Sequence, residues 1–258
     1  MFHAIIQARM GSKRLPGKVL RSYKNLTPLG VLCGRLKKIK EISKIIVATT
    51  KEKKDDKIVS FCKKLKISYF RGSTNNVLNR YYCAAKKFKS KEIIRLTADN
   101  PFIDKKTLVK MIGIKKKNLY DYVANTYPTP CTYPDGSDIE IFDYGTLKKT
   151  YKLAKLPSEK EHVTFLMWQS KIFAKKKINL KKNFSKVRYT IDTLDDFNLF
   201  TLIINKILKK NIFSANMEEI VRILLKSRKE TLYQKKLDRT FGWKPSFRKD
   251  ELYRKKLK

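Results

Sequence analysis

Short β-rich segments alternate with amphipathic segments through the first half of the chain. Four apolar runs predict buried strands, and they cover residues 3–8, 44–50, 67–72 and 92–97. Between these runs, apolar residues recur at helical spacing in residues 28–40, 55–66 and 75–88. Because strands that alternate with helices are joined by parallel crossovers, the pattern predicts an α/β fold with a mostly parallel sheet.

The alternation of predicted strands and helices stops in the middle of the chain. Residues 121–142 hold three prolines and a glycine between two strand-like pieces, which predicts a long irregular excursion rather than another strand–helix unit. Such loops often carry function or a partner surface. The segments that follow predict helices over 144–155 and 158–170, a strand over 186–192, and helices over 194–210 and 216–229.

The last part of the chain has a different composition. From about Thr231 onward the periodicity is lost and lysine and arginine dominate. The sequence therefore predicts one domain over residues 1–230 and a mobile basic tail over 231–258, which could dock through its aromatic residues Phe241, Trp243 and Phe247.

The net charge is the most conspicuous feature of the composition. The chain has 258 residues, of which 42% are hydrophobic, enough for one substantial core, and its formal charge is +38. Lysines occur in nearly every polar segment rather than in one block, and no zinc-finger spacing or aromatic RNA-binding strand is present. The charge therefore indicates lysine-rich solvated surfaces and an anionic substrate, and a specific nucleic-acid partner is not expected. A nucleic-acid-binding protein stays as an alternative.

The expected compartment of the protein is inferred from targeting and membrane-spanning patterns that the sequence does not show. The first residues have no basic start followed by a long apolar centre, and no apolar stretch approaches the roughly 20 residues that span a bilayer. Four cysteines, Cys33, Cys62, Cys83 and Cys131, are widely spaced, which favours small buried side chains in a reducing compartment over a metal site or disulfides. We expect a cytoplasmic protein without a membrane span.

The stretch QARMGSKRLPGKVL, residues 7–20, follows the first predicted strand. In open α/β sheets this is the usual place for a phosphate-binding loop. Two glycines let the backbone turn tightly, and four basic residues offer charge and hydrogen-bond donors: Gly11, Gly17, Arg9, Lys13, Arg14 and Lys18. The spacing matches neither the dinucleotide-binding nor the Walker A motif. An ordinary basic surface turn is the alternative, but the density of glycine and arginine after a buried strand favours anion binding.

The same stretch resembles the opening motif of the cytidylyltransferases that make CMP-activated acidic sugars, and most closely their spore coat polysaccharide biosynthesis SpsF-like branch. Further similar segments follow in order: IIVATT, FRGSTNNVLNRYYCAA, IIRLTADNPFID, YPDGSDIEIF, EKEHVTFLMW and VRYTIDTLDDF, so that the resemblance extends from residue 3 to about residue 200. It implies a Rossmann-like nucleotidyltransferase fold with helices on both faces of the sheet. It also implies transfer of CMP from CTP to a sugar, with release of pyrophosphate and Mg²⁺ as cofactor.

Two aspartates follow predicted strands and suit such a metal. Asp99 ends one strand segment and Asp192 ends another, so both reach the ligand-binding edge of the sheet. Two carboxylates suit Mg²⁺, which takes hard oxygen ligands and keeps several waters. Either aspartate alone could be a helix N-cap. Together with the cationic loop, they predict a metal site, and the resemblance implies the same role.

The remaining candidate residues divide into three groups. Arg9, Arg14 and Lys18 are expected to act in catalysis by stabilising charge. The nucleotide is expected at Ala8, Gly11, Ser12, Gly72, Ser73 and Arg80, although the family motif usually has an aspartate where this chain has Asn76. The acceptor sugar is expected at Asp135, Asp138, Glu140 and His162, because acidic residues accept hydrogen bonds from sugar hydroxyls. Turn chemistry around Gly136 and a structural histidine are the alternatives.

The sequence thus predicts a Mg²⁺-dependent cytidylyltransferase for surface polysaccharide biosynthesis, with CTP and a sugar or sugar phosphate as its small-molecule partners. The alternative enzyme is a glycosyltransferase of the GT-A type, which would need an aspartate pair one residue apart near a strand end. The segments DGSD and DTLDD have a different spacing. Which sugar is the acceptor, and whether a phosphate or an anomeric hydroxyl is attacked, stay open, and a homodimer is compatible with the sequence.

Overall fold

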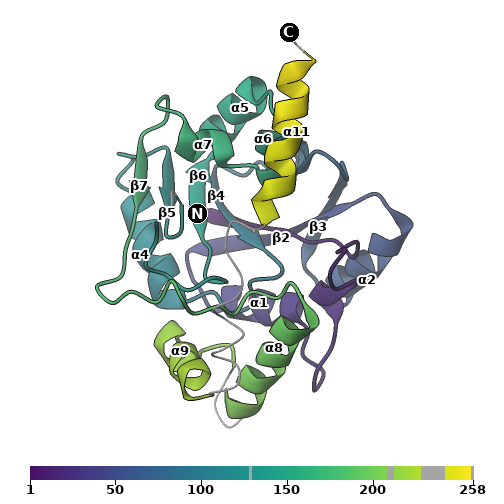
Figure 1. The fold of residues 1–258 in the computed structure, drawn as a ribbon, viewed down its shortest axis with the longest axis vertical. Coiled ribbons are helices and arrows are strands. Elements are labelled where there is room, and N and C mark those ends of the chain that lie inside the picture. Colours follow the sequence, from purple (N-terminus) through teal and green to yellow (C-terminus); the bar gives the residue numbers. More distant parts are fainter. Residues whose placement is uncertain (128–129, 208–211, 228–241, 257–258) are drawn as a thin grey trace.

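The structure is a computed structural model that describes residues 1–127, 130–207, 212–227 and 242–256 (Figure 1). Its sheet has seven strands: β1 (Phe2–Gln7), β2 (Ile42–Thr50), β3 (Ser68–Gly72), β4 (Glu92–Thr97), β5 (Tyr122–Ala124), β6 (Glu140–Asp143) and β7 (Lys175–Lys177). The order is β3-β2-β1-β4-β6-β5-β7, in which β6 runs antiparallel to β4 and β5 and the other neighbours are parallel. The predicted α/β fold with a mostly parallel sheet is confirmed.

Helices cover the sheet. The described helices are η1 (Lys18–Leu20), α1 (Pro28–Leu36), η2 (Lys53–Asp55), α2 (Asp56–Lys64), α3 (Val77–Lys87), α4 (Lys105–Lys115), α5 (Tyr144–Leu153), α6 (Pro157–His162), α7 (Phe165–Gln169), α8 (Leu194–Ile207), α9 (Met217–Lys226) and α11 (Lys244–Lys255). Among the described residues, none of these helices combines the length and apolar character that crossing a membrane requires.

The two faces of the sheet are buried in separate apolar clusters. Because side chains alternate along a strand, Ala4 and Ile6 of β1 pack with α1, α2, α4, α8 and α9, whereas Ile5 packs on the opposite face with α3, α5 and α7. Helices therefore lie on both faces, as Figure 1 shows, and the carboxyl ends of β1 and β4 meet at one edge between the two layers. This edge carries the candidate site.

Two segments differ from the sequence-based expectation. The helix predicted over 158–170 is broken into α6 and α7 at Val163, whose φ of 62° lies outside the helical region. The strand predicted over 186–192 is also wrong, because only one isolated bridge, between Arg188 and Asp135, forms there. The backbone of this segment is nevertheless paired, since Tyr189 N and Ile191 N donate to the carbonyls of residues 135 and 99.

The C-terminal part contains a helix that the sequence pattern did not indicate. Helix α11 packs against α6, and Trp243 and Phe247 contact the aromatic ring of Phe165. The proposed domain boundary near Thr231 and the predicted docking residue Phe241 lie outside the described residues, so the division into domain and tail stays a prediction.

Candidate active site

Three predicted residues meet at the carboxyl edge of the sheet. The Nζ atom of Lys18, in η1, lies 2.8 Å from Asp99 Oδ2 and 2.8 Å from Asp192 Oδ1. Lys18 Nζ also donates to the carbonyl of Ile191 at 2.6 Å. Burial lowers the pKa of Lys18, but attraction to the two carboxylates outweighs burial and leaves this pKa above its ordinary value. A single cation position is therefore shared by carboxylates from two distant segments.

The loop after β1 delivers Lys18 to this position. Gly17 has a φ of 71°, a conformation that favours glycine, and it turns the loop into η1. The fully buried Asp55 fixes the backbone of the loop, because its Oδ1 accepts a hydrogen bond from Met10 N at 2.7 Å. Ser12 Oγ accepts a weaker bond from Leu15 N at 3.4 Å. Asp55 was not among the predicted residues, since its partner lies 45 positions away.

Arg188 is a second residue that the sequence did not single out. Its guanidinium pairs with Asp135, with Asp192 at 3.0 Å and with Asp196 at 3.1 Å. Burial lowers the pKa of Arg188, but the three carboxylates raise it by more, so that this group stays charged. Arg14 adds a further contact to Asp192 at 2.9 Å. Burial raises the pKa of Asp192, but its cationic partners hold it well below the ordinary value.

The predicted nucleotide-binding residues lie around the opening loop. Ala8 is buried and its N donates to the carbonyl of Ala48, whereas Arg9 is exposed. A Cβ atom added at Gly11 would lie 2.8 Å from Lys54 Nζ, so Lys54, a cation that the sequence pattern did not indicate, lies over the loop. Lys54 also pairs with Glu52 at 2.5 Å. The loop after β1 thus places a closely approachable backbone and a positively charged side chain at the carboxyl edge of the sheet.

The turn after β3 is arranged around Arg80. Arg80 Nη1 donates to the carbonyl of Ser73 at 2.5 Å, and a Cβ at Gly72 would approach Arg80 Cγ at 3.0 Å. Burial lowers the pKa of Arg80, and the charge of Arg9 adds to this effect. Asn76, which replaces the aspartate common in the family motif, is the N-cap of α3 through Asn79 N at 2.8 Å. Arg80 is 2% exposed and therefore lies behind the loop rather than on the surface.

A cavity of about 190 Å³ opens beside the Lys18 cluster. Five predicted residues from both the metal and the acceptor groups line it: Asp99, Asp135, Asp138, His162 and Asp192. The other lining residues are Gln7, Arg95, Leu96, Thr97, Asn100, Tyr127, Arg188, Thr190, Gly242 and Trp243. The turn that supplies Asp135 and Asp138 requires a glycine, because Gly136 has a φ of 107° and a Cβ there would lie 2.4 Å from Thr190 N. The excursion predicted as functional thus contributes one wall of the cavity.

Glu140 is the predicted acceptor residue that the structure does not bring to the cavity wall. It is 1% exposed, and its carboxylate pairs with Arg95 and accepts hydrogen bonds from Tyr122 OH and Thr164 Oγ1, both at 2.5 Å. Burial, followed by the charge of Glu140, raises the pKa of Tyr122 well above its ordinary value. Glu140 therefore positions Arg95, which does line the cavity.

His162 reaches the cavity from α6. Its Nε2 lies 2.9 Å from Ser246 Oγ in α11, and its ring stacks on Phe165 at a centroid distance of 4.4 Å. Burial lowers the pKa of His162 to about 4, which makes the ring neutral near pH 7. The described residues contain no group of three or more His, Cys, Asp or Glu side chains placed to hold a metal ion. The fit for a divalent cation therefore rests on the two carboxylates that already converge on Lys18 Nζ.

Comparison with known proteins places this chain among specific relatives. It is 38% identical over 200 residues to an uncharacterized protein of Methanocaldococcus jannaschii, covering 76% of this chain and 80% of that one. It is 31% identical to the spore coat polysaccharide biosynthesis protein SpsF of Bacillus subtilis, covering 85% and 92%. A solved structure of a cytidylyltransferase from Leptospira borgpetersenii aligns with a TM-score of 0.82 at 33% identity, covering 89% and 96%.

More distant solved structures share the fold. A CMP:2-keto-3-deoxy-manno-octonic acid synthetase complexed with CTP aligns with a TM-score of 0.61 at 15% identity, covering 80% and 99%. The Rv0371c protein of Mycobacterium tuberculosis in complex with manganese aligns with a TM-score of 0.53 at 16% identity, covering 76% and 96%. The family model described as Cytidylyltransferase matches residues 3–239, nearly the whole chain. The resemblance of the sequence motifs is thereby confirmed, and the chain belongs to the cytidylyltransferase family.

Proposed function

We propose that this protein transfers CMP from CTP to an acidic sugar or sugar phosphate, with Mg²⁺ as cofactor and release of pyrophosphate, in surface polysaccharide biosynthesis. The observation that carries the proposal is the cation position shared by Asp99 and Asp192, directly beside the cationic loop after β1. A nucleotidyl transfer needs positive charge along a triphosphate and an open position for an acceptor. Asp99 and Asp192 line one cavity here, and Lys18 of the loop contacts both of them.

The carboxylates of Asp99 and Asp192 would hold the metal. Their oxygens already share one cation, the Lys18 ammonium, and their side chains are 29% and 22% exposed, so water can complete the coordination that Mg²⁺ prefers. The manganese complex of the distantly related Rv0371c protein supports divalent-metal use on this fold. When bound, Mg²⁺ would neutralise charge on the phosphates as pyrophosphate departs.

The side chains of the chain itself supply the remaining electrostatics. The Lys18 ammonium occupies the shared position and Arg14 contacts Asp192 beside it, and both side chains would stabilise negative charge that builds up on the departing pyrophosphate. An acceptor oxygen would attack the α-phosphorus, its new P–O bond replacing the bond to the β-phosphate oxygen. A hydroxyl acceptor would lose its proton to solvent, and no covalent enzyme intermediate would form. Arg188 would keep Asp192 and Asp135 in place during the transfer.

The identities of nucleotide and acceptor come from the family and its relatives. CTP is proposed because the family model is that of cytidylyltransferases and the related synthetase was solved with CTP. A role in polysaccharide synthesis is proposed because of the similarity to SpsF. The cavity of about 190 Å³ is smaller than the roughly 300–1,000 Å³ typical of ligand sites, so it would hold the acceptor and phosphates while the nucleoside lies over the loop after β1.

Pyrophosphate release by the purified protein tests this proposal. CTP, UTP, ATP and GTP are each incubated with Mg²⁺ and a panel of acidic keto-sugars and sugar phosphates. We expect release with CTP and one class of acceptor, and little release with purine nucleotides, because polar groups that pair with one base stay unpaired with another. Mass spectrometry of the product then distinguishes a CMP-linked sugar from a CDP-linked one.

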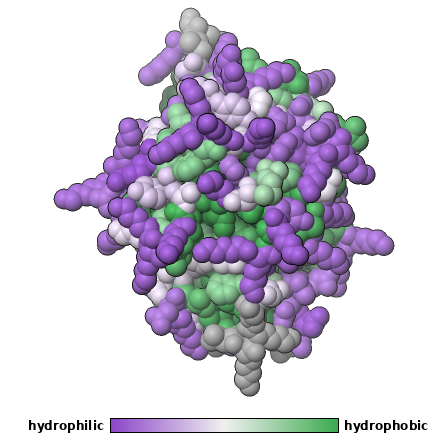
Figure 2. All heavy atoms as spheres, turned by 180° about the vertical axis from the view of Figure 1, so that it is seen from behind, coloured by the Kyte–Doolittle hydropathy of each residue, from purple (hydrophilic) through white to green (hydrophobic). Residues whose placement is uncertain are grey.

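Either of two results would refute the proposal and favour another function. Consumption of a nucleotide sugar in the presence of a glycan acceptor, without pyrophosphate release from any nucleotide, would identify a glycosyltransferase. Sequence-selective binding of RNA or DNA that persists at physiological salt would identify a nucleic-acid-binding protein, since non-specific binding by dispersed lysines falls steeply with salt. Figure 2 shows hydrophilic side chains projecting on all sides of one face, around a more apolar central region, rather than in one block.

A further inference from the structure

We propose that the C-terminal helix α11, with the Trp243 that precedes it, forms the acceptor end of the active site, where the indole of Trp243 packs against the ring of a hydroxylated acceptor. This inference rests on the proposed function and specifies which residues position its second substrate. The family model matches residues 3–239, so Trp243 and α11 lie beyond the part of the chain that it matches.

Trp243 is placed at the cavity by a group of aromatic rings. Its ring centroid lies 5.1 Å from Phe165, 5.3 Å from Tyr127 and 5.9 Å from Trp168. Such contacts fix the orientation of the indole and leave Trp243 and Tyr127 as aromatic lining of the cavity. Aromatic side chains that line a pocket bind the apolar faces of ligand rings, while a few polar groups set orientation.

Two side chains that line the same cavity each carry a polar atom without a hydrogen-bond partner among the described residues. Arg95 and Asn100 are 9% and 3% exposed, and both line the cavity. Among the described residues, Arg95 Nε and Asn100 Oδ1 have no hydrogen-bond partner. One of these atoms is a donor and the other an acceptor, and buried polar atoms are normally paired. A ligand hydroxyl can both donate and accept, so a polyhydroxylated ring beside the aromatic wall would pair with both buried atoms once the two side chains turn them toward the cavity.

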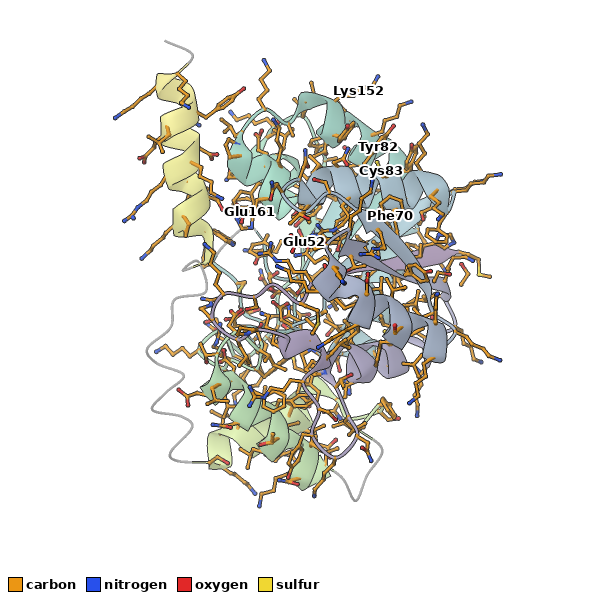
Figure 3. All side chains as sticks on the ribbon, turned by 90° about the vertical axis from the view of Figure 1, so that its right-hand side faces the viewer. Glu52, Phe70, Tyr82, Cys83, Lys152 and Glu161 are labelled. Atoms are coloured by element: carbon orange, nitrogen blue, oxygen red, sulfur yellow. The ribbon has the colours of Figure 1, made fainter. Side chains whose placement is uncertain are left out.

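Helix α11 is held on the domain by buried polar contacts. Asp250 Oδ1 accepts a hydrogen bond from Ser158 N at 2.8 Å, and both residues are buried. Ser246, which is 1% exposed, lies 2.9 Å from His162 Nε2 and donates to Glu161 Oε2 at 2.9 Å. Figure 3 shows Glu161 on the side of the domain that faces this helix. Because buried polar atoms are costly to leave unpaired, these contacts fix α11 in one position.

The contact with Ser246 also settles which nitrogen of His162 is available. Nε2 is engaged by the hydroxyl of Ser246, which leaves Nδ1 as the ring nitrogen outside that contact. Helix α11 thus acts on the acceptor end twice, directly through Trp243 and through the orientation of His162. Ser246 acts on the acceptor only through His162, and it is therefore a positioning residue.

Steady-state kinetics of two aromatic variants test the inference. Trp243→Ala is expected to raise the KM for the acceptor about tenfold, with the KM for CTP changed less than about twofold, because only the acceptor loses contact area. Trp243→Phe should restore most of the loss. Phe247→Ala is the matched control, since Phe247 packs on the same Phe165 ring but does not line the cavity. Thermal melting of each variant verifies that it is folded.

Fluorescence gives a second readout that does not depend on turnover. The chain has two tryptophans, so Trp168→Phe leaves Trp243 as the only one, and acceptor binding should change its emission. Equal changes in both KM values, or kinetics of Trp243→Ala indistinguishable from those of Phe247→Ala, would refute the inference while leaving the proposed function intact. Absence of pyrophosphate release from the wild-type protein with every acceptor would refute both.

Discussion

Lys18 offers the sharpest test of the candidate site, because the chain contains a matched lysine elsewhere. Lys18 Nζ contacts two carboxylates and the carbonyl of Ile191, whereas Lys115 Nζ contacts Asp143 Oδ2 at 2.8 Å and the carbonyl of Tyr120 at 3.0 Å. Both side chains are buried, with exposures of 10% and 3%. Neither lysine lines the cavity, but Lys18 contacts Asp99 and Asp192, which do, whereas the partners of Lys115 in α4 lie outside the lining. Substituting each lysine by methionine keeps the apolar stem and removes the charge.

The two substitutions should cost similar stability. Removing one partner of a fully buried ion pair costs about 3–5 kcal/mol, because the other charge stays buried without compensation. Here the carboxylates that remain are 22% to 32% exposed, Asp192 keeps Arg14 and Arg188, and Asp143 keeps the amide of Thr146. We therefore expect a loss of about 1–3 kcal/mol in the free energy of unfolding for each variant, measured by chemical denaturation.

Activity should separate the two variants. Lys18→Met is expected to lower kcat for pyrophosphate release by roughly a hundredfold, because charge that stabilises the transition state is lost, whereas Lys115→Met should stay within about twofold of wild type. Rates are measured at a temperature where both variants are folded. If both variants lost activity in proportion to their loss of stability, or if Lys18→Met kept its full rate, the catalytic role of Lys18 would be excluded.

Three further predictions follow from individual contacts. Asp99→Asn and Asp192→Asn should each raise the Mg²⁺ concentration for half-maximal activity about tenfold or more, since an amide lacks a carboxylate's charge, and an unchanged titration would remove that residue from the metal site. Because burial lowers the pKa of His162 to about 4, the unfolded chain takes up this proton first as pH falls, and up to about 3 kcal/mol of stability should be lost between pH 6.5 and 4; His162→Gln should flatten that part of the pH–stability curve. Gly136→Ala should destabilise the protein by about 1–3 kcal/mol or more through backbone strain and a clash with Thr190 N, whereas Gly113→Ala, in α4 with open space around it, should be neutral or slightly stabilising in the same melting experiment.

The elements that the sequence predicts well are those whose apolar pattern is local. The strands β1 to β4 and the helices between them were located to within a few residues, because the strands carry short β-rich runs and the helices carry apolar residues at helical spacing. Residues 186–192 carry the same kind of pattern but pair through two backbone hydrogen bonds with residue 135 and one with residue 99. No local pattern distinguishes such a segment from a strand. The break at Val163 likewise depends on tertiary packing rather than on a glycine or proline signal.

The residues of the candidate site likewise divide into those that a local sequence pattern predicts and those that only the tertiary structure reveals. The sequence predicted that Lys18, Asp99 and Asp192 meet because each stands at or after the end of a predicted strand. The strand that was to end at Asp192 does not form, but the structure still places the three residues within hydrogen-bond distance. Arg188 could not be found in this way, since it stands alone in an apolar run and its partner Asp135 is 53 positions distant. Trp243 lies in a lysine-rich segment whose composition suggests a solvated tail. Its role as cavity lining is visible only once α11 is docked on α6.

The local charge balance gives the proposed divalent cation a role even in a strongly basic protein. The ion pairs around Lys18 that the described residues make join four carboxylates to three cationic side chains: Asp99, Asp135, Asp192 and Asp196 with Arg14, Lys18 and Arg188. The overall charge of +38 draws anions toward the protein, but at this edge the lysine and arginine charges are already shared with carboxylates. A triphosphate that entered alone would compete with four carboxylates for three cations. An added divalent cation reverses that balance, which is why nucleotide affinity should depend on the metal more strongly than on the exposed lysines.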